Sequence, residues 1–421
     1  MTPQCSIIIP VYGCWHLTRD CLESLRQHLP SHGVEIIVVD NGSLDETPQA
    51  LPALGERLFG PAFKGVRSAT NLGFARGCNL GAKQATGEYL FFLNNDTLAL
   101  PGFWEPLHEE LRQEGGIVGS RLLYPGGERV QHVGVSFTPG PKVCHIFEFF
   151  PATHPAVCCK RHVQAVTGAA LALPRELFWQ LGGFDEGFTN GLEDVDLCLK
   201  AGQMGASVRC QPQSTLIHLT SQTPGRFAAE TANAQYFFQR WGGAIRPDFH
   251  RFAAGEGYTM GLSATLQPVM ALPPHKLQTL EEQFGASHDP TLWLEAIHTE
   301  PLWRPGYDNL AQWLENRQAW ADALPLRTLA ARFFPCTATA LALAKTATRA
   351  HDQALAHYAG QMLQYQRQAQ GQRNELVSWA RHLSQTLRHL GEEDLARLYD
   401  AWMRKPPTEF LVLPNAAGPA S

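Results

Sequence analysis

Acidic side chains follow two apolar stretches of this chain, an arrangement typical of a site that binds a charged ligand. The stretch 89–93 (YLFFL) runs directly into Asn94, Asn95 and Asp96. A β-branched stretch ends in the same way at Asp40. Ligands of open parallel sheets bind just beyond the carboxyl ends of the strands, so a carboxylate at that edge could hold a metal ion or a phosphorylated substrate. The Asn-Gly-Ser that follows Asp40 is also typical of a turn without a binding role.

Three further acids, Glu193, Asp194 and Asp196, fall at the start of an expected helix. Acids in a first turn are favoured by the helix dipole, so capping alone could explain them. Residues three apart share a helix face, which predicts that Glu193 and Asp196 point together and Asp194 points elsewhere. One of these carboxylates could then face a cleft and act as a general base.

Histidines and cysteines supply further candidates for metal binding. His218 ends the apolar stretch 214–217, so we expect it at another strand end, where it could be a metal ligand with acidic company or a structural residue. A looser group could form a zinc site, although it lacks a Cys-X-X-Cys pair, and packed thiols with solvated loop residues are the alternative. This group comprises Cys144, His145, His154, Cys158, Cys159 and His162.

The elements that position these residues alternate between strand and helix. Short β-branched stretches at 6–12 and 35–40 flank a helical pattern at 17–25, which is typical of a βαβ unit with buried parallel strands. The alternation continues through the stretch 89–93, and we therefore predict an α/β layered fold. From about 116 to 173 we expect short strands and long loops, followed by helices near 174–182 and 193–200.

A glycine-punctuated segment that contains Asn71 and Gly73 precedes an expected helix, where backbone amides could face an anionic ligand. The segment lacks the lysine of a phosphate-binding P-loop. No dinucleotide fingerprint follows the first strand, which argues against a nicotinamide enzyme. The net charge of −5 without a basic cluster argues against a nucleic-acid partner.

The C-terminal part has a different texture, because the strand signal disappears beyond Trp241. We predict an α/β domain at 1–250, a connector at 251–291, an all-α helical domain at 292–410 and a flexible tail at 411–421. In the helical part, Leu310-Ala311 with Ala323 is echoed by Leu343-Ala344 with Ala354, which resembles tetratricopeptide repeats. A generic helical bundle is the alternative. Such repeats usually bind a protein in a groove, so a protein partner at 292–402 is expected.

Composition also bears on the cellular compartment. No apolar run approaches the roughly 20 residues of a transmembrane helix, and the chain enters a strand without a signal peptide. We expect a cytoplasmic protein without a transmembrane segment, with peripheral attachment at the inner face of a membrane as one option. The ten cysteines are scattered singly, so we expect most of them to be reduced and buried.

These pieces occur in an order that resembles the family 2 inverting glycosyltransferases of GT-A fold. The resemblance covers residues 1 to about 245 and is greatest to the rhamnosyltransferase-like and galactofuranosyltransferase-like branch. The motifs that carry it stand at 7–12, 38–43, 71–75, 93–96, 167–169, 182–186 and 193–194.

The resemblance implies a role for each matching position. Asp194 is implied as the general base with Glu193 beside it, and Asp96 with His218 as ligands of a divalent cation, Mn²⁺ or Mg²⁺. Phe184, Asp185 and Glu186 are implied to face the acceptor. The residues implied to bind the nucleotide sugar are Pro10, Val11, Tyr12, Asp40, Asn71, Gly73, Asn94, Asn95, Thr167 and Gly168. Among them, Asp40 would accept from the pyrimidine ring N–H, and Asn94 to Asp96 would be an altered Asp-X-Asp motif.

The resemblance therefore implies metal-dependent, inverting transfer of a hexose or deoxyhexose. The donor would be a UDP- or dTDP-linked sugar, and the acceptor a hydroxyl group of a glycan or a protein. The alternative is a nucleotide-sugar-binding adaptor with weakened catalysis, whose helical repeats dock a protein partner. Asn94, which stands where the motif usually has its first carboxylate, and its neighbour Asn95 keep that alternative open.

Overall fold

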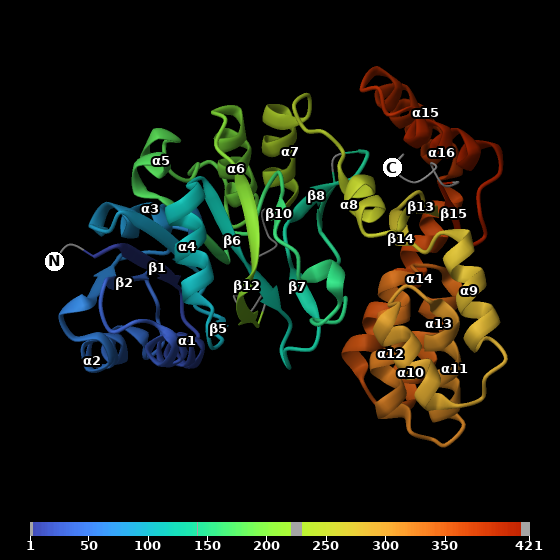
Figure 1. The fold of residues 1–421 in the computed structure, drawn as a ribbon, viewed down its shortest axis with the longest axis horizontal. Helices are drawn as coiled ribbons and strands as arrows, with labels where there is room; N and C mark the ends of the chain where they lie inside the picture. Colours follow the sequence, from blue (N-terminus) through green and yellow to red (C-terminus); the bar gives the residue numbers. More distant parts are fainter. Residues whose placement is uncertain (1–2, 141, 220–229, 414–421) are drawn as a thin grey trace. The chain divides into compact units, whose positions relative to one another are not determined.

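The computed structural model describes residues 3–140, 142–219 and 230–413. The chain divides into two compact units (Figure 1). The first comprises residues 1–136 and 143–245, and the second comprises residues 137–142 and 246–421. The boundary therefore falls at 245/246, close to the predicted end of the α/β domain at residue 250.

A mixed sheet forms the centre of the first unit, in the strand order β10-β12-β6-β11-β4-β1-β2-β3. Strands β1 to β4 are parallel, β11 is antiparallel to both β4 and β6, and β6 is parallel to β12. The carboxyl ends of β1, β2, β4, β6 and β12 therefore lie at one edge of the sheet. The strands are β1 (Cys5–Val11), β2 (Val34–Asp40), β3 (Phe63–Arg67), β4 (Tyr89–Leu93), β5 (Thr97–Ala99), β6 (Ile117–Leu123), β7 (Val130–His132), β10 (Arg161–His162), β11 (Ala170–Pro174) and β12 (Val208–His218).

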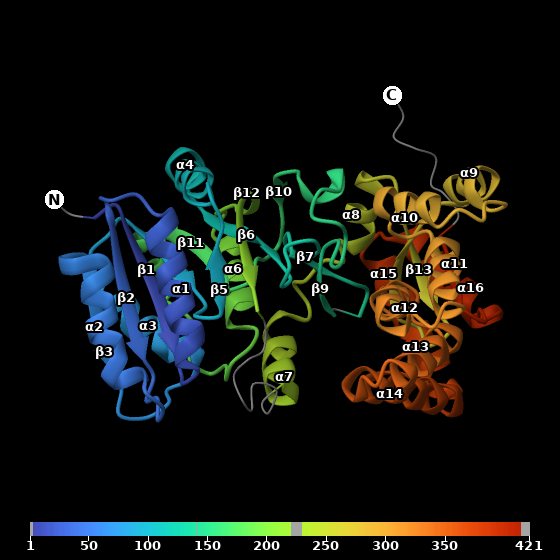
Figure 2. The same cartoon turned by 90° about the horizontal axis from the view of Figure 1, so that it is seen from below.

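Helices cover both faces of this sheet. Ile7 and Ile8 point to opposite faces of β1, and both are fully buried. Helix α3 packs on β1 and β2, and α4 packs on β6 and β12; Figure 2 shows the sheet between its helices. The predicted α/β layered fold is confirmed. The helices are α1 (Trp15–His28), α2 (Thr47–Phe59), α3 (Phe74–Gln84), α4 (Trp104–Glu114), α5 (Arg175–Gln180), α6 (Glu193–Gln203) and α7 (Glu230–Trp241), with 3-10 turns η1 (Gly60–Ala62) and η2 (Pro155–Val157).

A short hairpin leaves the main sheet after β7. Its strands β8 (Val135–Phe137) and β9 (Val143–His145) form a separate two-stranded sheet. Val135 also forms an isolated bridge to Ala165. This hairpin lies within the region where short strands and long loops were predicted.

The second unit contains consecutive helices and one small sheet. Helices α11 to α14 pack each on the next, and α15 packs on α16. Strand β13 lies between β14 and β15 in an antiparallel sheet. The elements are α8 (Phe249–Gly255), β13 (Thr259–Ser263), β14 (Pro268–Ala271), α9 (Pro274–Phe284), α10 (Pro290–Thr299), α11 (Arg304–Glu315), α12 (Trp320–Phe333), α13 (Thr337–Arg349), α14 (Gln353–Gly371), α15 (Arg373–His389), α16 (Glu393–Arg404) and β15 (Phe410–Val412).

This small sheet corrects three expectations from the sequence. The range 251–291 contains two strands, the whole of α9 and parts of α8 and α10, so it is not a plain connector. The unit is helical but not all-α, and β15 occupies the start of the predicted tail; residues 414–421 lie outside the described residues. Local sequence patterns did not predict this sheet, because β13 pairs with β15, which lies about 150 residues further along the chain. In this pair Ser263 stands opposite Phe410. The indole of Trp402 on α16 donates to the carbonyl of Ser263 at 2.8 Å and adds a further link.

The helix spacing agrees with a two-helix repeat. Helices α11 and α13 begin 33 residues apart (337 − 304), and α12 and α14 also begin 33 apart (353 − 320). Leu310, Ala311 and Ala323 are buried as the first repeat requires. In the second, Leu343 is buried but Ala354 is exposed, and Ala347 and Ala359 complete the core instead. The likeness to tetratricopeptide repeats stays a prediction.

Candidate active site

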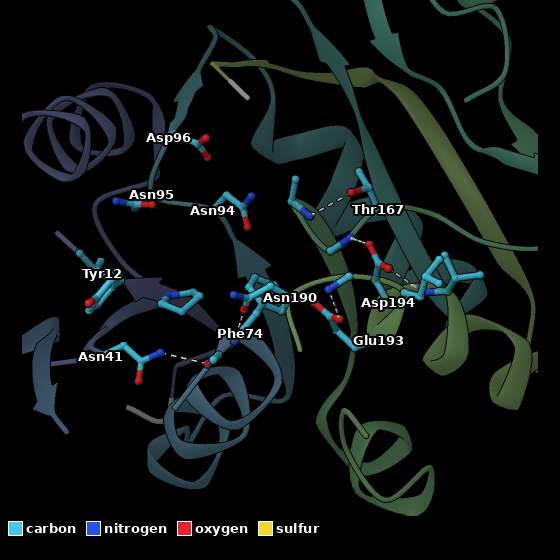
Figure 3. Close-up of a pocket in the computed structure, with 18 of the residues that line it drawn as sticks. Tyr12, Asn41, Phe74, Asn94, Asn95, Asp96, Thr167, Asn190, Glu193 and Asp194 are labelled. Carbon is cyan, nitrogen blue, oxygen red and sulfur yellow. Dashed lines mark hydrogen bonds between the residues drawn. The ribbon is translucent and has the colours of Figure 1, made fainter. Parts of the chain in front are cut away.

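The carboxyl edge of the main sheet holds a cavity of about 290 Å³. Figure 3 shows its walls, which come from the end of β1, the segment after β4, the turn before β11 and the loop before α6. Segments far apart in the sequence thus meet at one site, as expected from the strand ends. Among the predicted site residues, the cavity is lined by Pro10, Val11, Tyr12, Asn71, Gly73, Asn94, Asn95, Asp96, Thr167, Gly168, Glu193 and Asp194.

Asp194 is held by backbone amides at the start of α6. Its Oδ2 accepts from Gly168 N at 2.6 Å, and its Oδ1 accepts from Val195 N at 2.8 Å. A Cβ atom at position 168 would lie 3.2 Å from the Asp194 Cβ, so glycine permits this close approach. Within the described ranges, Asp194 makes no ion pair with a lysine or arginine. Its carboxylate is therefore oriented without a cationic side chain to neutralise it.

Glu193 lines the same cavity, whereas Asp196 does not. Glu193 Oε2 accepts from the amide of Gly191 at 2.6 Å, so the side chain folds back over the loop before the helix. Asp196 is fully buried, and its carboxylate accepts from the indole of Trp241 at 2.8 Å and pairs with Lys200 at 2.7 Å. The prediction that Glu193 and Asp196 share a direction is therefore wrong, because Asp196 anchors α7.

Two asparagines that we did not single out organise the cavity. Asn41 donates through Nδ2 to the carbonyl of Gly73 at 2.9 Å, and its Oδ1 accepts from Leu72 N at 2.9 Å. Asn190 Oδ1 accepts from Phe74 N at 2.8 Å, at the first residue of α3. The loop before α6 is thereby tied to the segment at 71–74. The sequence signal for this role was an Asn-Gly pair shortly before a helix, because asparagine tolerates the left-handed region. Asn190 adopts a φ of 54° there.

Asp40 lies at the carboxyl edge but not in this cavity. It is buried, with 2% of its surface exposed, and its Oδ1 accepts from Ser43 N at 2.8 Å, as in an Asx turn. Its Oδ2 accepts no hydrogen bond from a described residue, and Arg67 Nε lies 3.5 Å away. Asp40 instead lines a separate cavity of about 680 Å³ with Pro48 and Leu51. The turn is present, and the binding role stays a prediction.

Asp96 and His218 meet at the ends of β4 and β12. Asp96 Oδ1 lies 3.1 Å from His218 Nε2, and both side chains are buried. His218 Nδ1 lies 2.6 Å from Gln131 Oε1, and Gln131 Nε2 donates to the carbonyl of His218, which orients the amide oxygen as the acceptor for an Nδ1–H. Asn94 Nδ2 lies 3.3 Å from His218 Nε2, whereas Asn95 turns away and donates to Thr18.

This pair fits a divalent cation. His218 turns Nε2 toward the Asp96 carboxylate while Nδ1 contacts Gln131, so an imidazole nitrogen and a carboxylate oxygen lie side by side with the second ring nitrogen fixed, as is common among metal ligands. The part of the chain that the structure describes contains no group of three or more His, Cys, Asp or Glu side chains placed to hold a metal. Asp96 and His218 would therefore supply two ligands and leave the others to substrate oxygens or water, as is common for Mg²⁺.

The residues implied to face the acceptor lie outside the cavity wall. Phe184 is buried and packs edge-on against Phe74, at 5.9 Å between ring centroids. Asp185 pairs with Arg240 at 2.6 Å, and Glu186 Oε1 accepts from Asn79 at 3.1 Å. Their contacts are those of packing and tertiary ion pairing, and the acceptor role stays a prediction.

All ten cysteines are free thiols. Most are buried, as predicted, and burial raises the pKa of the Cys21 thiol to about 12. The histidine and cysteine group between 144 and 162 forms no three-ligand cluster among the described residues. Cys158 and Cys159 are exposed, and the Cys158 sulfur accepts from Arg121 at 3.7 Å. The zinc alternative has no support.

Comparison with known proteins identifies the class of the first unit. Residues 6–182 match the model of glycosyl transferase family 2. This segment of the chain is therefore similar to glycosyl transferase family 2, the family that the sequence motifs resemble. It lies in the α/β unit that precedes the helical region.

Individual relatives match a little over half of the chain. It is 34% identical over 56% of its length to the O-antigen biosynthesis protein RfbC of Myxococcus xanthus. It is 31% identical over 57% of its length to an uncharacterized protein, y4gI, of Sinorhizobium fredii. These matches span 19% and 28% of the two relatives, so the chain spans less than a third of either. The crystal structure of GalNAc-T7 with UDP, GalNAc and Mn²⁺ aligns with a TM-score of 0.47 and 16% identity, over 57% of this chain and 48% of that one.

From the sequence we expected no transmembrane segment. No helix in the described ranges is both long and apolar enough to cross a membrane.

Proposed function

We propose that this chain is an inverting, metal-dependent glycosyltransferase. It transfers a hexose or deoxyhexose from a UDP- or dTDP-linked donor to a hydroxyl group of a glycan or protein. One observation carries the proposal: the amide-held carboxylate of Asp194 lines the same cavity as Asp96, and Asp96 lies in the segment 6–182 that matches glycosyl transferase family 2. The cavity volume of about 290 Å³ is close to the lower end of common ligand pockets, roughly 300 Å³.

Asp194 acts as the general base. Its carboxylate takes the proton of the acceptor hydroxyl while that oxygen forms a bond to the anomeric carbon of the donor sugar. The bond from the anomeric carbon to the diphosphate oxygen breaks with its electron pair leaving on the diphosphate. Attack from the face opposite the leaving group inverts the anomeric configuration. General base assistance of this kind typically contributes about 10²–10⁴-fold.

The backbone amide of Gly168 and the carboxylate of Glu193 support this role. Gly168 N–H fixes the Asp194 carboxylate by a 2.6 Å hydrogen bond, and Glu193 fixes the loop before α6 through Gly191. The two hydrogen bonds, one to each carboxylate oxygen of Asp194, fix the orientation of the side chain. Because the loop also binds the start of α3 through Asn190, the base is held at a defined distance from the 71–74 segment.

Asp96 and His218 would hold the divalent cation, and the cation would neutralise the charge that develops on the departing diphosphate. Asn94 contributes a neutral amide at 3.3 Å from His218, so the site carries one carboxylate where the usual motif carries two. We expect the affinity for metal alone to be low and to increase when nucleotide supplies further oxygen ligands.

Nucleotide recognition is assigned to the other side of the cavity. Tyr12, Asn71 and Gly73 line it there, and the Asp40 carboxylate has an oxygen without a hydrogen-bond donor among the described residues. A buried acceptor of this kind is costly unless a donor reaches it, and a pyrimidine N–H is such a donor. Ordering of the 68–73 segment on a bound nucleotide would be needed to bring the base to Asp40.

The relatives support a glycan acceptor in the first place. The O-antigen biosynthesis protein RfbC is named for glycan assembly, and the chain is 34% identical to its matched part. A protein acceptor has weaker support, from 26% identity to the human polypeptide N-acetylgalactosaminyltransferase 15. The 33-residue spacing of helix pairs in the second unit supports docking of a protein partner at 292–402.

A donor screen tests the proposal. The full chain is incubated with UDP- and dTDP-linked sugars in Mn²⁺ or Mg²⁺, with a mixed bacterial glycan preparation as acceptor, and released nucleoside diphosphate is measured. We expect release with one or two donors, loss of release with a chelator, and an inverted linkage in the product. Absence of release with every donor, or release that a chelator does not affect, contradicts the proposal.

A further inference from the structure

Leu192 lines the cavity in a backbone conformation that leucine rarely adopts. Its φ of 74° lies in the left-handed region, and it is the N-cap of α6 without a side-chain hydrogen bond to the helix. Glycine and asparagine tolerate that region, and short polar residues or glycine are preferred at an N-cap. The two preceding residues follow this preference, since they are Asn190 and Gly191. Local backbone preference therefore does not explain a leucine at position 192.

Core packing does not explain Leu192 either. Another leucine and two phenylalanines have a left-handed φ, and all three are packed. Leu266 and Phe147 are buried, with 7% and 2% of their surface exposed, and Phe149 stacks on Tyr124 at 5.0 Å between ring centroids. Leu192 is only partly buried, and it faces the cavity. Strained residues cluster at ligand sites, so contact with a ligand would supply the missing compensation for the strain.

Phe74 adds an aromatic ring to the same cavity. The ring packs edge-on against the buried ring of Phe184, at 5.9 Å between centroids. A Cβ atom at Gly168 would lie 3.4 Å from two carbons of the Phe74 ring and 3.2 Å from the Asp194 Cβ. The ring and the base therefore border the same glycine. Because the Phe74 amide also donates to Asn190 Oδ1 at 2.8 Å, the residue is fixed beside the base without a ligand.

Phe74 lies between the side of the cavity assigned to the nucleotide and the side that holds the base. It follows Gly73 directly, and Figure 3 shows it between Tyr12 and Asp194. In a bound donor, the group between the nucleotide and the base is the transferred sugar, because it carries the carbon that the acceptor attacks. The C–H face of a pyranose ring is apolar, and an aromatic ring and a leucine side chain offer matching surface.

The cavity wall also selects by charge. Glu193 and Asp194 line it, whereas no lysine or arginine of the described ranges does. A carboxylate on the transferred sugar would face these acids without a cationic side chain to compensate it, and like charges at short distance repel. The wall therefore suits a neutral sugar.

We propose that Phe74 and Leu192 bind the C–H face of a neutral transferred sugar and determine which donor sugar is accepted. The inference rests on the proposed function and deepens it, because it narrows the donor to neutral sugars and excludes uronic acids. On this assignment, the strain at Leu192 is retained because a glycine there would leave one face of the sugar in contact with water.

Donor kinetics of the full chain test the role of the ring, with the donor and acceptor found in the screen. Phe74→Ala should raise the donor KM about tenfold, which corresponds to about 55 Å² of apolar surface left in water. Phe74→Tyr keeps the ring and should recover most of the loss. Phe74→Leu keeps apolar volume without a flat ring and should show a smaller increase, which tests the assignment even if the alanine variant does not fold.

Two controls accompany these variants. Inhibition by free nucleoside diphosphate should not change in Phe74→Ala, because that inhibitor lacks the sugar. Phe238→Ala, at an exposed phenylalanine outside the cavity, should keep the donor KM of the wild type. A parallel loss of donor and nucleoside diphosphate affinity in Phe74→Ala would assign the ring to the nucleotide and overturn the inference.

A glycine at position 192 separates ligand contact from packing. Leu192→Gly relieves the backbone strain, so the thermal midpoint should stay unchanged or increase, while the donor KM should rise several-fold. Leu266→Gly has a similar φ of 61° but removes a buried side chain, and it should lower the thermal midpoint. An equal decrease of the midpoint in both variants would show that Leu192 serves packing, and would overturn its part in the inference.

Competition between two nucleotide sugars tests the charge selection. UDP-glucuronic acid and UDP-glucose differ at C6, where one carries a carboxylate and the other a hydroxymethyl group. As inhibitors of transfer, UDP-glucuronic acid should be about tenfold weaker than UDP-glucose. Equal inhibition would contradict the assignment of a neutral sugar.

The outcomes are distinguishable from failure of the proposed function. If the wild type transfers sugar and Phe74→Ala keeps its donor KM, this inference is wrong and the proposed function stands. If only the acceptor KM rises, the apolar surface faces the acceptor and the inference is again wrong. If the wild type releases nucleotide from no donor, both are wrong.

Discussion

Glu110 and Asp194, at opposite edges of the same sheet, are held by different kinds of partner. At the amino edge, Glu110 on α4 is buried with Arg209 at 2.6 Å and Lys160 at 2.6 Å, so two cations compensate one acid. At the carboxyl edge, Asp194 receives only backbone N–H donors from Gly168 and Val195. Both acids are held firmly, but only one of them keeps an uncompensated negative charge.

The difference shows which acids are available for chemistry. A paired buried acid contributes to the tertiary structure, because removal of one partner leaves the other charge buried without compensation. An acid bonded to neutral donors is stabilised as a carboxylate and can still attract a cation or accept a proton. We therefore expect Glu110 at the amino edge to contribute to folding, and we propose that Asp194 at the carboxyl edge acts on the ligand.

The largest expected effect is on catalysis at the carboxyl edge. Asp194→Asn should lower kcat about 10²–10⁴-fold, because an amide keeps the shape and the contact with Gly168 but cannot accept the proton. Inhibition by nucleoside diphosphate should change less than twofold. Steady-state transfer assays check this, and wild-type turnover in the variant would exclude Asp194 as the base.

The matching change at the amino edge should affect stability instead. Glu110→Gln leaves buried Arg209 without its counter-charge and should lower the free energy of unfolding by about 3–5 kcal/mol. The kcat of the folded fraction should stay within twofold. Urea unfolding measures this, with Glu109→Gln as control, because Glu109 pairs with Arg112 at the exposed surface, where solvent screens the pair and its contribution to stability is small. A loss in Glu110→Gln no greater than in the control would refute the contrast between the edges.

Asp40→Asn separates the two roles considered for that residue. An asparagine Oδ1 can still accept from Ser43 N, so the turn should persist. The carboxylate that would accept from the pyrimidine is lost, and affinity for nucleoside diphosphate should fall about 10–100-fold, equivalent to about 1.5–3 kcal/mol for a hydrogen bond to a charged group. Calorimetric titration gives the affinity. Unchanged affinity would leave Asp40 with the turn alone.

The smallest effect comes from a single methyl group beside the base. In Gly168→Ala the new Cβ would lie 3.2 Å from the Asp194 Cβ, so the carboxylate must shift by a few tenths of an ångström. We expect kcat to fall about tenfold with little change in the donor KM, since small misplacement is costly for catalysis. Gly202→Ala on α6 has open space at its Cβ and is the control. Equal kcat in both variants would show that the position of Asp194 is not limiting.

Local patterns predicted much of the first unit. The apolar stretches at 6–12, 35–40 and 89–93 fold as strands because each is short, β-branched or aromatic, and bounded by turn residues. The rule that ligands bind at carboxyl ends predicted a site at Asp96, and the family resemblance added Tyr12 and Asn94; all three residues line one cavity. The rule could not predict that Asp40 lines a different cavity. That cavity is formed by Asp40 together with residues of α2 and β3.

Features made by distant pairing escaped prediction. Strands β13 and β15 form one sheet across most of the helical region, and neither is long enough to give a local signal. Asn190 binds Phe74, 116 residues away, and His132 meets His145 across a hairpin. The direction of Asp196 was also wrong, because its partner Trp241 lies on a separate helix. Each depends on tertiary contacts that sequence spacing does not encode.

Hydrogen–deuterium exchange with nucleoside diphosphate is the most direct test of the contrast between the edges. The full chain is measured alone, with Mn²⁺, and with Mn²⁺ plus UDP or dTDP. We predict slower exchange in peptides covering 71–74, 94–96, 167–169 and 190–195 when nucleotide and metal are both present. Peptides covering the amino edge at 105–116 and 207–211 should not change. Protection at the amino edge, or none at the carboxyl edge with either nucleotide, would contradict the account.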